Sequence, residues 1–75
     1  MGVQSPVVIV NNTKERFAQV EATMRQMYQV GASTKNGART TFFFHTEKDQ
    51  KGAAFFMESE GIEVLATRIY DIGNS

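Results

Sequence analysis

Two short segments of this chain are apolar at consecutive positions, and they restrict the possible folds more than any other feature. The first is the run Val-Val-Ile-Val at 7–10, and the second is the run of three phenylalanines at 42–44. Successive side chains of a strand point to opposite faces of its sheet. Both segments therefore predict strands that are apolar on both faces, and such strands lie in the centre of a sheet.

The segment between these two strands has the periodicity of an amphipathic helix. Its apolar side chains recur at helical spacing and share one face: they are Phe17, Val20, Met24, Met27 and Tyr28. Asn12 and Glu15 fit the capping box at a helix N-terminus, and Gly31 fits the residue that follows a helix C-terminus. We therefore predict a helix over residues 13–30.

A hairpin is expected around the pair Asn36-Gly37, because Asn-Gly strongly favours a two-residue type I′ turn. The turn would join a short strand at 32–34 to a longer strand at 39–46, which contains the phenylalanine run. Alternation along this longer strand places Phe42 and Phe44 on the core side and Phe43 on the opposite side.

A second helix is predicted after the hairpin. Thr46 followed by Asp49 fits the first turn of a helix, in which the hydroxyl accepts a hydrogen bond from a backbone amide. We expect this helix to run over 47–60 and to end at Gly61, since glycine readily adopts the left-handed conformation that ends many helices.

The end of the chain predicts one more strand, over residues 62–69, and Tyr70 then begins a polar tail. One alternative stays open for this half of the chain. The pair Phe55-Phe56 also suits a strand, so a β-meander from 39 to 71 would replace the second helix.

The predicted order of elements is β-α-β-β-α-β, which is the order of a ferredoxin-like α+β sandwich. That fold has a four-stranded antiparallel sheet with both helices on one face. The alternative is β-α followed by the β-meander. We expect a single domain over residues 1–75, with residues 1–5 as a flexible lead and 71–75 as a flexible tail.

Composition argues against several classes of function. The chain has eight basic and eight acidic side chains, no cysteine and a single histidine, His45. A formal net charge of zero argues against nucleic acid as a partner, and one histidine without cysteine cannot form a His/Cys metal cluster. No apolar segment is long enough to cross a membrane. We expect a cytoplasmic protein without metal, cofactor or membrane association.

The helix-free face of such a sheet would keep a second set of apolar side chains, and an apolar surface of this kind marks an interaction site. We expect it to be an interface lined by Phe43, His45, Arg68 and Tyr70. The chain is predicted to be a small interaction or regulatory module without enzymatic activity. Its expected partner is a second copy, in a homodimer that packs through this face. A different protein is the alternative partner.

A small-ligand-binding regulatory domain, with its site at a dimer interface, is one alternative. The chain is similar to the ACT-type regulatory domains in four places: the Asn-rich turn at 11–12, the segment Phe17–Val20, Gly31 at the start of a strand, and the last turn at 61–64. That resemblance implies a metabolite site between two copies. The chain departs from the family where Thr13-Lys14-Glu15 replaces the usual Pro-Gly, so no ligand residue is carried over.

Two further alternatives depend on the aromatic strand and the histidine. Aromatic side chains on a sheet can stack on bases, so the run at 42–44 keeps open a module that binds single-stranded RNA or DNA. His45 is the side chain whose charge changes near neutral pH. It could therefore act as an acid or base, together with Glu47 or Asp49, in a small dimeric α+β barrel enzyme.

Overall fold

The structure, a computed structural model, describes residues 3–72 of the chain, and it confirms the predicted order of elements. The strands and helices are β1 Val3–Asn11, α1 Phe17–Met27, β2 Val30–Asn36, β3 Arg39–Phe44, α2 Glu47–Ser59 and β4 Val64–Ile72. Part of the predicted lead and tail therefore belongs to strands, since residues 3–5 lie in β1 and residues 71–72 lie in β4. Residues 1–2 and 73–75 are outside the described part.

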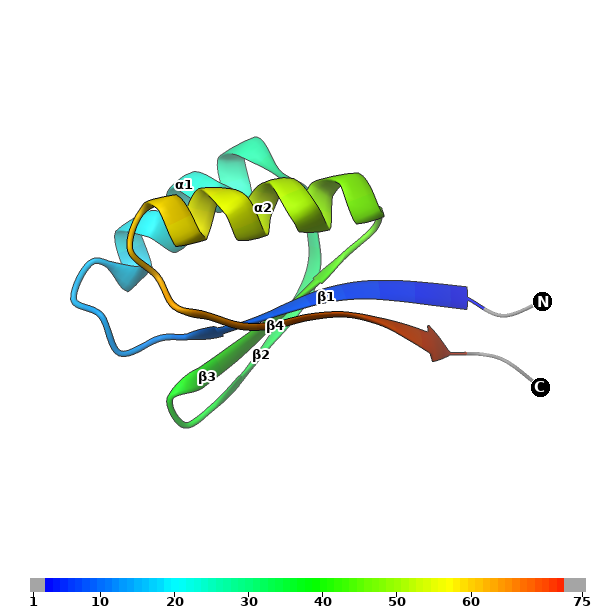
Figure 1. Cartoon of the computed structure of the whole chain (residues 1–75), viewed down its shortest axis with the longest axis horizontal. Helices are drawn as coiled ribbons and strands as arrows, with labels where there is room; N and C mark the ends of the chain where they lie inside the picture. The colour runs from blue at the N-terminus through cyan, green and yellow to red at the C-terminus, as the bar shows by residue number, and fades with distance from the viewer. Residues whose placement is uncertain (1–2, 73–75) are drawn as a thin grey trace.

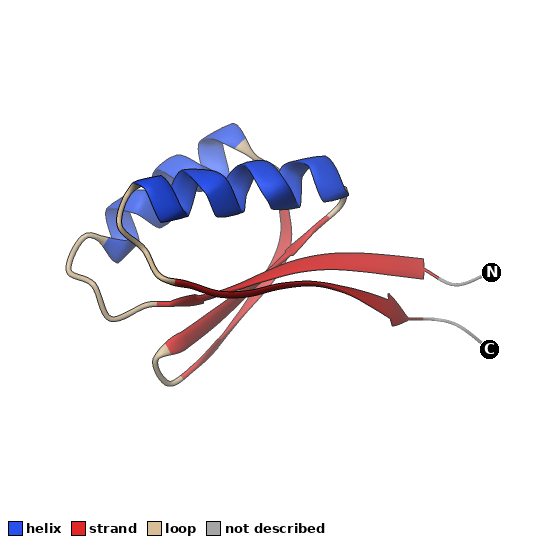
Figure 2. Ribbon diagram, in the orientation of Figure 1, coloured by secondary structure: helices blue, strands red, loops and turns tan. Residues whose placement is uncertain are grey.

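The four strands form one antiparallel sheet in the order β2-β3-β1-β4. Strands β1 and β3 are central, as their apolar character on both faces predicts. Both helices lie on the same side of the sheet (Figures 1 and 2). This is the ferredoxin-like arrangement, and the segment of the alternative β-meander contains α2 instead.

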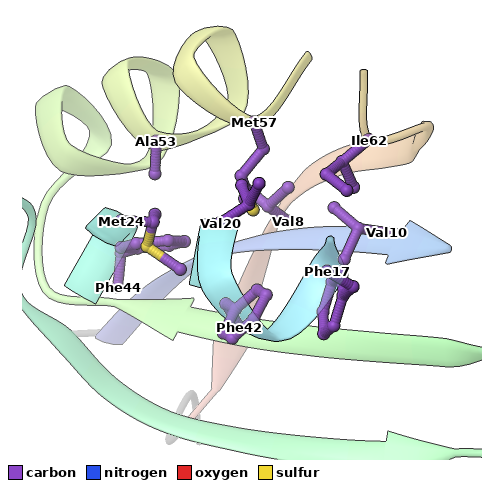
Figure 3. Packing of buried hydrophobic residues seen from close by; sticks show 10 residues of the cluster. All are labelled: Val8, Val10, Phe17, Val20, Met24, Phe42, Phe44, Ala53, Met57 and Ile62. Carbon is purple, nitrogen blue, oxygen red and sulfur yellow. The ribbon is translucent and has the colours of Figure 1, made fainter. Parts of the chain in front are cut away.

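The hydrophobic core fills the space between the helices and one face of the sheet (Figure 3). Its buried side chains come from β1, β3, both helices and the segment before β4. They are Val8, Val10, Phe17, Val20, Met24, Phe42, Phe44, Ala53, Met57 and Ile62. The rings of Phe17 and Phe42 stack at 6.5 Å between centroids, so α1 is held directly over β3. The predicted orientation of Phe42 and Phe44 toward the helices is confirmed.

Helix α1 begins later than predicted, because Asn12 does not cap it. The Asn12 side chain donates hydrogen bonds to the carbonyl oxygen of Gly37 and to Thr40 Oγ1, both at 3.0 Å. It therefore joins the loop after β1 to the β2–β3 hairpin. The helix starts only at Phe17, and the residue before it makes no side-chain capping bond.

Helix α1 also ends earlier than predicted, and Gly31 is not its stop signal. The chain becomes extended at Tyr28, and β2 already starts at Val30. Gly31 lies in β2, where the register to β3 shifts. Met27 was predicted on the apolar stripe, but it is 49% exposed at the last position of the helix.

The β2–β3 turn is a two-residue turn of a different type from the one predicted. Asn36 pairs with Arg39, so Gly37 and Ala38 are the two central residues. Gly37 has φ of +63°, and none of the described non-glycine residues has a positive φ. A positive φ at the first central residue alone matches type II′, whereas type I′ requires it at both.

The predicted start of α2 is confirmed. Thr46 Oγ1 accepts a hydrogen bond from the backbone amide of Asp49 at 3.1 Å. The helix ends at Ser59, one residue earlier than predicted, and Gly61 follows with φ of +88°. That conformation is easily adopted only by glycine.

Strand β4 starts two residues later and ends three residues later than predicted. Ile62 is not part of the strand, because its side chain enters the core and is 2% exposed. The strand runs to Ile72 because it stays paired with β1, which itself begins at Val3. Tyr70 is therefore a strand residue and not the start of a tail.

A buried glutamine fixes α2 over the sheet. Gln50 is 3% exposed, and its Nε2 donates hydrogen bonds to the carbonyl oxygens of Val7, at 2.9 Å, and of Arg68, at 2.8 Å. Val7 and Arg68 are opposite each other in the β1–β4 pair. One amide group therefore joins the helix to both strands, and its own burial is compensated by the two bonds.

A glycine inside α2 makes room for a tyrosine of the connection between α1 and β2. A Cβ atom at Gly52 would lie 2.6 Å from Tyr28 Cε1 and 2.9 Å from Cζ. Tyr28 packs against the hydrophobic core. The glycine is therefore required by packing, although glycine lowers helix stability by about 1 kcal/mol relative to alanine.

We expect Gly52→Ala to lower the free energy of unfolding by about 1 kcal/mol, because displacing the Tyr28 ring outweighs the gain in helix propensity. In a Tyr28→Ala background the same substitution should instead raise the stability by about 1 kcal/mol. Urea unfolding of the four proteins measures the difference. An equal gain in the free energy of unfolding in both backgrounds would show that the Tyr28 ring does not require a glycine at position 52.

Candidate functional site

The face of the sheet opposite the helices is the candidate site, and we call it the open face. Alternation from the core residues Val8 and Phe42 defines its members. They are Ser5, Val7, Ile9 and Asn11 on β1, Ala32, Thr34 and Asn36 on β2, Arg39, Thr41 and Phe43 on β3, and Ala66, Arg68 and Tyr70 on β4. His45 directly follows β3 at one end of this face.

Strand pairing brings the four residues predicted for the interface together on the open face. Phe43 and Arg68 are both direct partners of Val7, so the three side chains form a row across the sheet. Tyr70 is the partner of Ser5, and His45 lines the same shallow groove as Ser5. The predicted set therefore surrounds the N-terminal half of β1.

The open face has an apolar centre and a polar rim. Val7 is 0% exposed although no helix covers this side, since it is flanked by the larger side chains of Phe43 and Arg68. Phe43 is half-buried, Tyr70 is 40% exposed, and His45 is exposed. Such a combination is typical of surfaces that bind another molecule.

The charges of the open face have one sign. Arg39 and Arg68 are exposed members of this face, and none of its members as defined above is a carboxylate. Asp71 is adjacent to Tyr70 on β4 and therefore belongs to the opposite side of the sheet. The chain has no net charge, so its cations and anions are distributed unevenly over its surface.

A shallow groove of about 470 Å³ lies at the end of the open face where β1, β2 and β3 meet. It is lined by Gln4, Ser5, Gly31, Ala32, Phe43, Phe44 and His45. Gly31 brings the backbone close to the imidazole, because a Cβ atom there would lie 3.2 Å from His45 Nε2. The lining offers an imidazole and a hydroxyl group but no carboxylate to orient them, so it lacks the set of groups that acid–base catalysis uses.

A second hollow, of about 400 Å³, lies between the start of α1 and β2. Its lining includes the cations of Lys14 and Lys35 and the carboxylates of Glu15 and Glu21. These charges are of both signs, and Glu21 is already paired with Arg25 at 3.0 Å. Within residues 3–72, every buried polar side-chain atom has a hydrogen-bond partner, so no buried group there is left for a ligand to satisfy.

The described part of the chain has neither a group of metal-ligating side chains nor a helix that could span a membrane. It contains no cluster of three or more His, Asp or Glu side chains that could hold a metal ion. No helix between residues 3 and 72 is long and apolar enough to span a bilayer.

Besides Met27, sequence reasoning missed three exposed apolar side chains. Leu65 and Ile69 lie on β4, where the prediction had ended the strand at Ile69 and treated the following residues as a tail. Phe55 is 74% exposed on α2. Its exposure could have been predicted, since it lies two positions from the buried Ala53 and Met57, on the opposite side of a helix with 3.6 residues per turn.

Comparison with known proteins gives this chain no relative. No protein-family model, no curated protein and no solved structure matches it.

Proposed function

We propose that this chain is a small, non-enzymatic interaction or regulatory module that associates with a second copy of itself through the open face. One observation carries the proposal: apolar side chains on both central strands, among them Val7, Ile9 and Phe43, face away from the helices. A second sheet packed on this face would complete a second apolar layer about 10 Å thick.

The size of the chain supports self-association. A domain of about 60 residues buries only about 60% of the surface that its unfolded chain exposes, and larger domains bury more. This chain has 75 residues and no disulfide. A partner copy would remove more apolar surface from water.

The chemistry around His45 supports a role without catalysis. Within the described residues, no hydrogen bond or ion pair involves its imidazole, and the groove that it lines contains no carboxylate. A catalytic histidine is normally oriented by a third group through its second ring nitrogen. A binding surface needs no such orientation, and an exposed imidazole is an ordinary part of a polar rim.

Three Phe→Asp variants test the open-face contact. We expect the wild-type chain to have at least twice its 8.4 kDa mass in light scattering coupled to size exclusion. Phe43→Asp should lower this mass but leave a cooperatively folded chain, because Phe43 is half-buried on the open face. Phe42→Asp should abolish folding, since Phe42 is fully buried and losing a core aromatic costs about 3–5 kcal/mol even without a buried charge.

Phe55→Asp is the matched control. It introduces the same charge at a side chain that is 74% exposed on α2, so it should change neither the fold nor the mass. A wild-type chain that stays at 8.4 kDa at every concentration, or a Phe43→Asp variant with the wild-type mass, would refute the open-face contact.

A second candidate function, binding of single-stranded nucleic acid, is favoured by one observation. The open face combines the aromatic side chains of Phe43 and Tyr70 with Arg39 and Arg68, and no member of the face is a carboxylate. Bases stack on exposed aromatic side chains, and guanidinium groups contact the phosphates. The zero net charge of the chain is the argument against this function.

Fluorescence anisotropy with labelled oligo-dT and oligo-U tests the second candidate. If it is correct, binding should weaken markedly between about 50 and 200 mM salt. Tyr70→Ala should weaken it by about 1–3 kcal/mol, since that is the contribution of one stacked base. An anisotropy that does not change with protein concentration would leave the homodimer as the single function supported by this face.

A further inference from the structure

Strand β4 forms an outer edge of the sheet and carries apolar side chains that no part of residues 3–72 covers. In the order β2-β3-β1-β4 it pairs on one side only, with β1. Leu65, Ile69 and Tyr70 are 41%, 39% and 40% exposed. A long, apolar edge strand with free backbone groups is a template for pairing with another strand.

One end of this edge also extends beyond the layer of helices (Figure 1). Gln50, one turn into α2, is bonded to the carbonyl groups of Val7 and Arg68. Beyond that level, the start of β1 and the end of β4 continue as a two-stranded ribbon past the first turn of α2 (Figure 1). Two strands alone are marginally stable in water, whereas additional strands stabilise a sheet. The projecting ribbon therefore favours the addition of a strand.

We propose that β4 pairs with β4 of a second copy as antiparallel strands, with the two-fold axis of the dimer at Ile69. Ile69 would then lie opposite Ile69 of the second copy, and Arg68 opposite Tyr70 of the second copy. The two sheets join into one continuous sheet, and the ribbon becomes four strands wide, in the order β1-β4-β4-β1.

The register follows from which side chains meet. Opposite residues of an antiparallel pair point to the same face, so the axis passes through a residue and not between two. A two-fold axis at Arg68 would place two guanidinium groups opposite each other. An axis at Tyr70 would place Ile69 opposite Asp71 of the second copy. At Thr67 the pairing would include the irregularity around Leu65, where the register between β1 and β4 shifts.

The axis at Ile69 avoids these conflicts. It places an exposed isoleucine against its own copy on the helix side of the sheet. On the open face it produces two Arg–Tyr pairs, in which a guanidinium group can lie over an aromatic ring. The surface is therefore complementary to itself, as a two-fold symmetric contact requires. A second copy of this chain is for that reason the partner that fits the edge.

This contact can be tested separately from the proposed contact through the open face, although Arg68 and Tyr70 belong to both. Ile69 pairs with Pro6 on the helix side of the sheet, so a substitution there leaves the open face unchanged. The edge axis is perpendicular to the sheet, and the axis of a face-to-face pair lies parallel to it. Perpendicular two-fold axes close a four-chain assembly, so both contacts together predict four chains, and either one alone predicts two.

Single cysteines test the register, since the chain has no cysteine of its own. Opposite Cα atoms in an antiparallel pair are about 4.5–5.5 Å apart, within the range of a disulfide. We expect Ile69→Cys to form a covalent dimer under mild oxidation. Thr67→Cys should not, because two copies of Thr67 would be about 13 Å apart along the strands. Leu65→Cys is the second control, with nearly the same exposure as Ile69.

The cross-link separates this inference from the open-face contact. Ile69→Cys should still form the covalent dimer when combined with Phe43→Asp, which changes only the open face. Ile69→Lys should halve the mass measured by light scattering, while Leu65→Lys keeps it and both variants remain folded. No cross-link at Ile69, equal cross-linking at Thr67 or Leu65, or loss of the cross-link with Phe43→Asp would each overturn the proposed edge contact.

Discussion

The structure depends on the burial of β1 between two neighbouring strands. β1 pairs with β3 on one side and with β4 on the other, and its residues 7–10 are apolar on both faces. Val8 and Val10 form the floor of the core beneath the helices, where they meet the aromatic residues of β3. Because a strand alternates, the same run must place Val7 and Ile9 on the other face. The residues that stabilise the fold thus also make the open face apolar.

Local sequence patterns predicted the features of the fold that depend on local geometry. The periodicity of α1, the Thr46–Asp49 cap of α2, and the opposite orientations of Phe42 and Phe43 all follow from spacing within a few residues. The order of elements then fixed the sheet, since few topologies join these elements with short connections. The central strands were predictable because a strand that is buried on both faces is apolar at consecutive positions.

The errors arose where a distant part of the chain decides the local structure. Asn12 has the residue type of a helix cap, but its amide bonds to groups 25 and 28 residues away. Gly52 is explained by Tyr28, on the other side of the hairpin in sequence. The length of β4 depends on β1, whose first residues extend the ladder. None of these contacts has a signature within a short window of sequence.

The same reasoning explains why the predicted site was incomplete. Phe43, His45, Arg68 and Tyr70 could be assigned to one face by alternation alone, and the register places them around Val7 and Ser5. The role proposed for Ile69 depends on β4 being an edge strand that extends past the first turn of α2. Whether a strand lies at the edge is a property of the whole sheet, so it cannot be predicted from one segment of the sequence.

Self-association through the β4 edge and self-association through the open face bury different parts of the chain. Pairing at the β4 edge widens the sheet but covers neither of its faces, so it leaves the half-buried side chains of Ile9 and Phe43 on the open face partly in contact with water. An edge dimer alone would therefore present two open faces side by side, each with Arg39 and Arg68 and without a carboxylate among its members. A doubled surface of one charge sign suits an extended anionic partner, whereas a face-to-face contact would remove it. If the open face packs against a second copy, the chain binds only itself. If the open face stays free, it is available to a different partner.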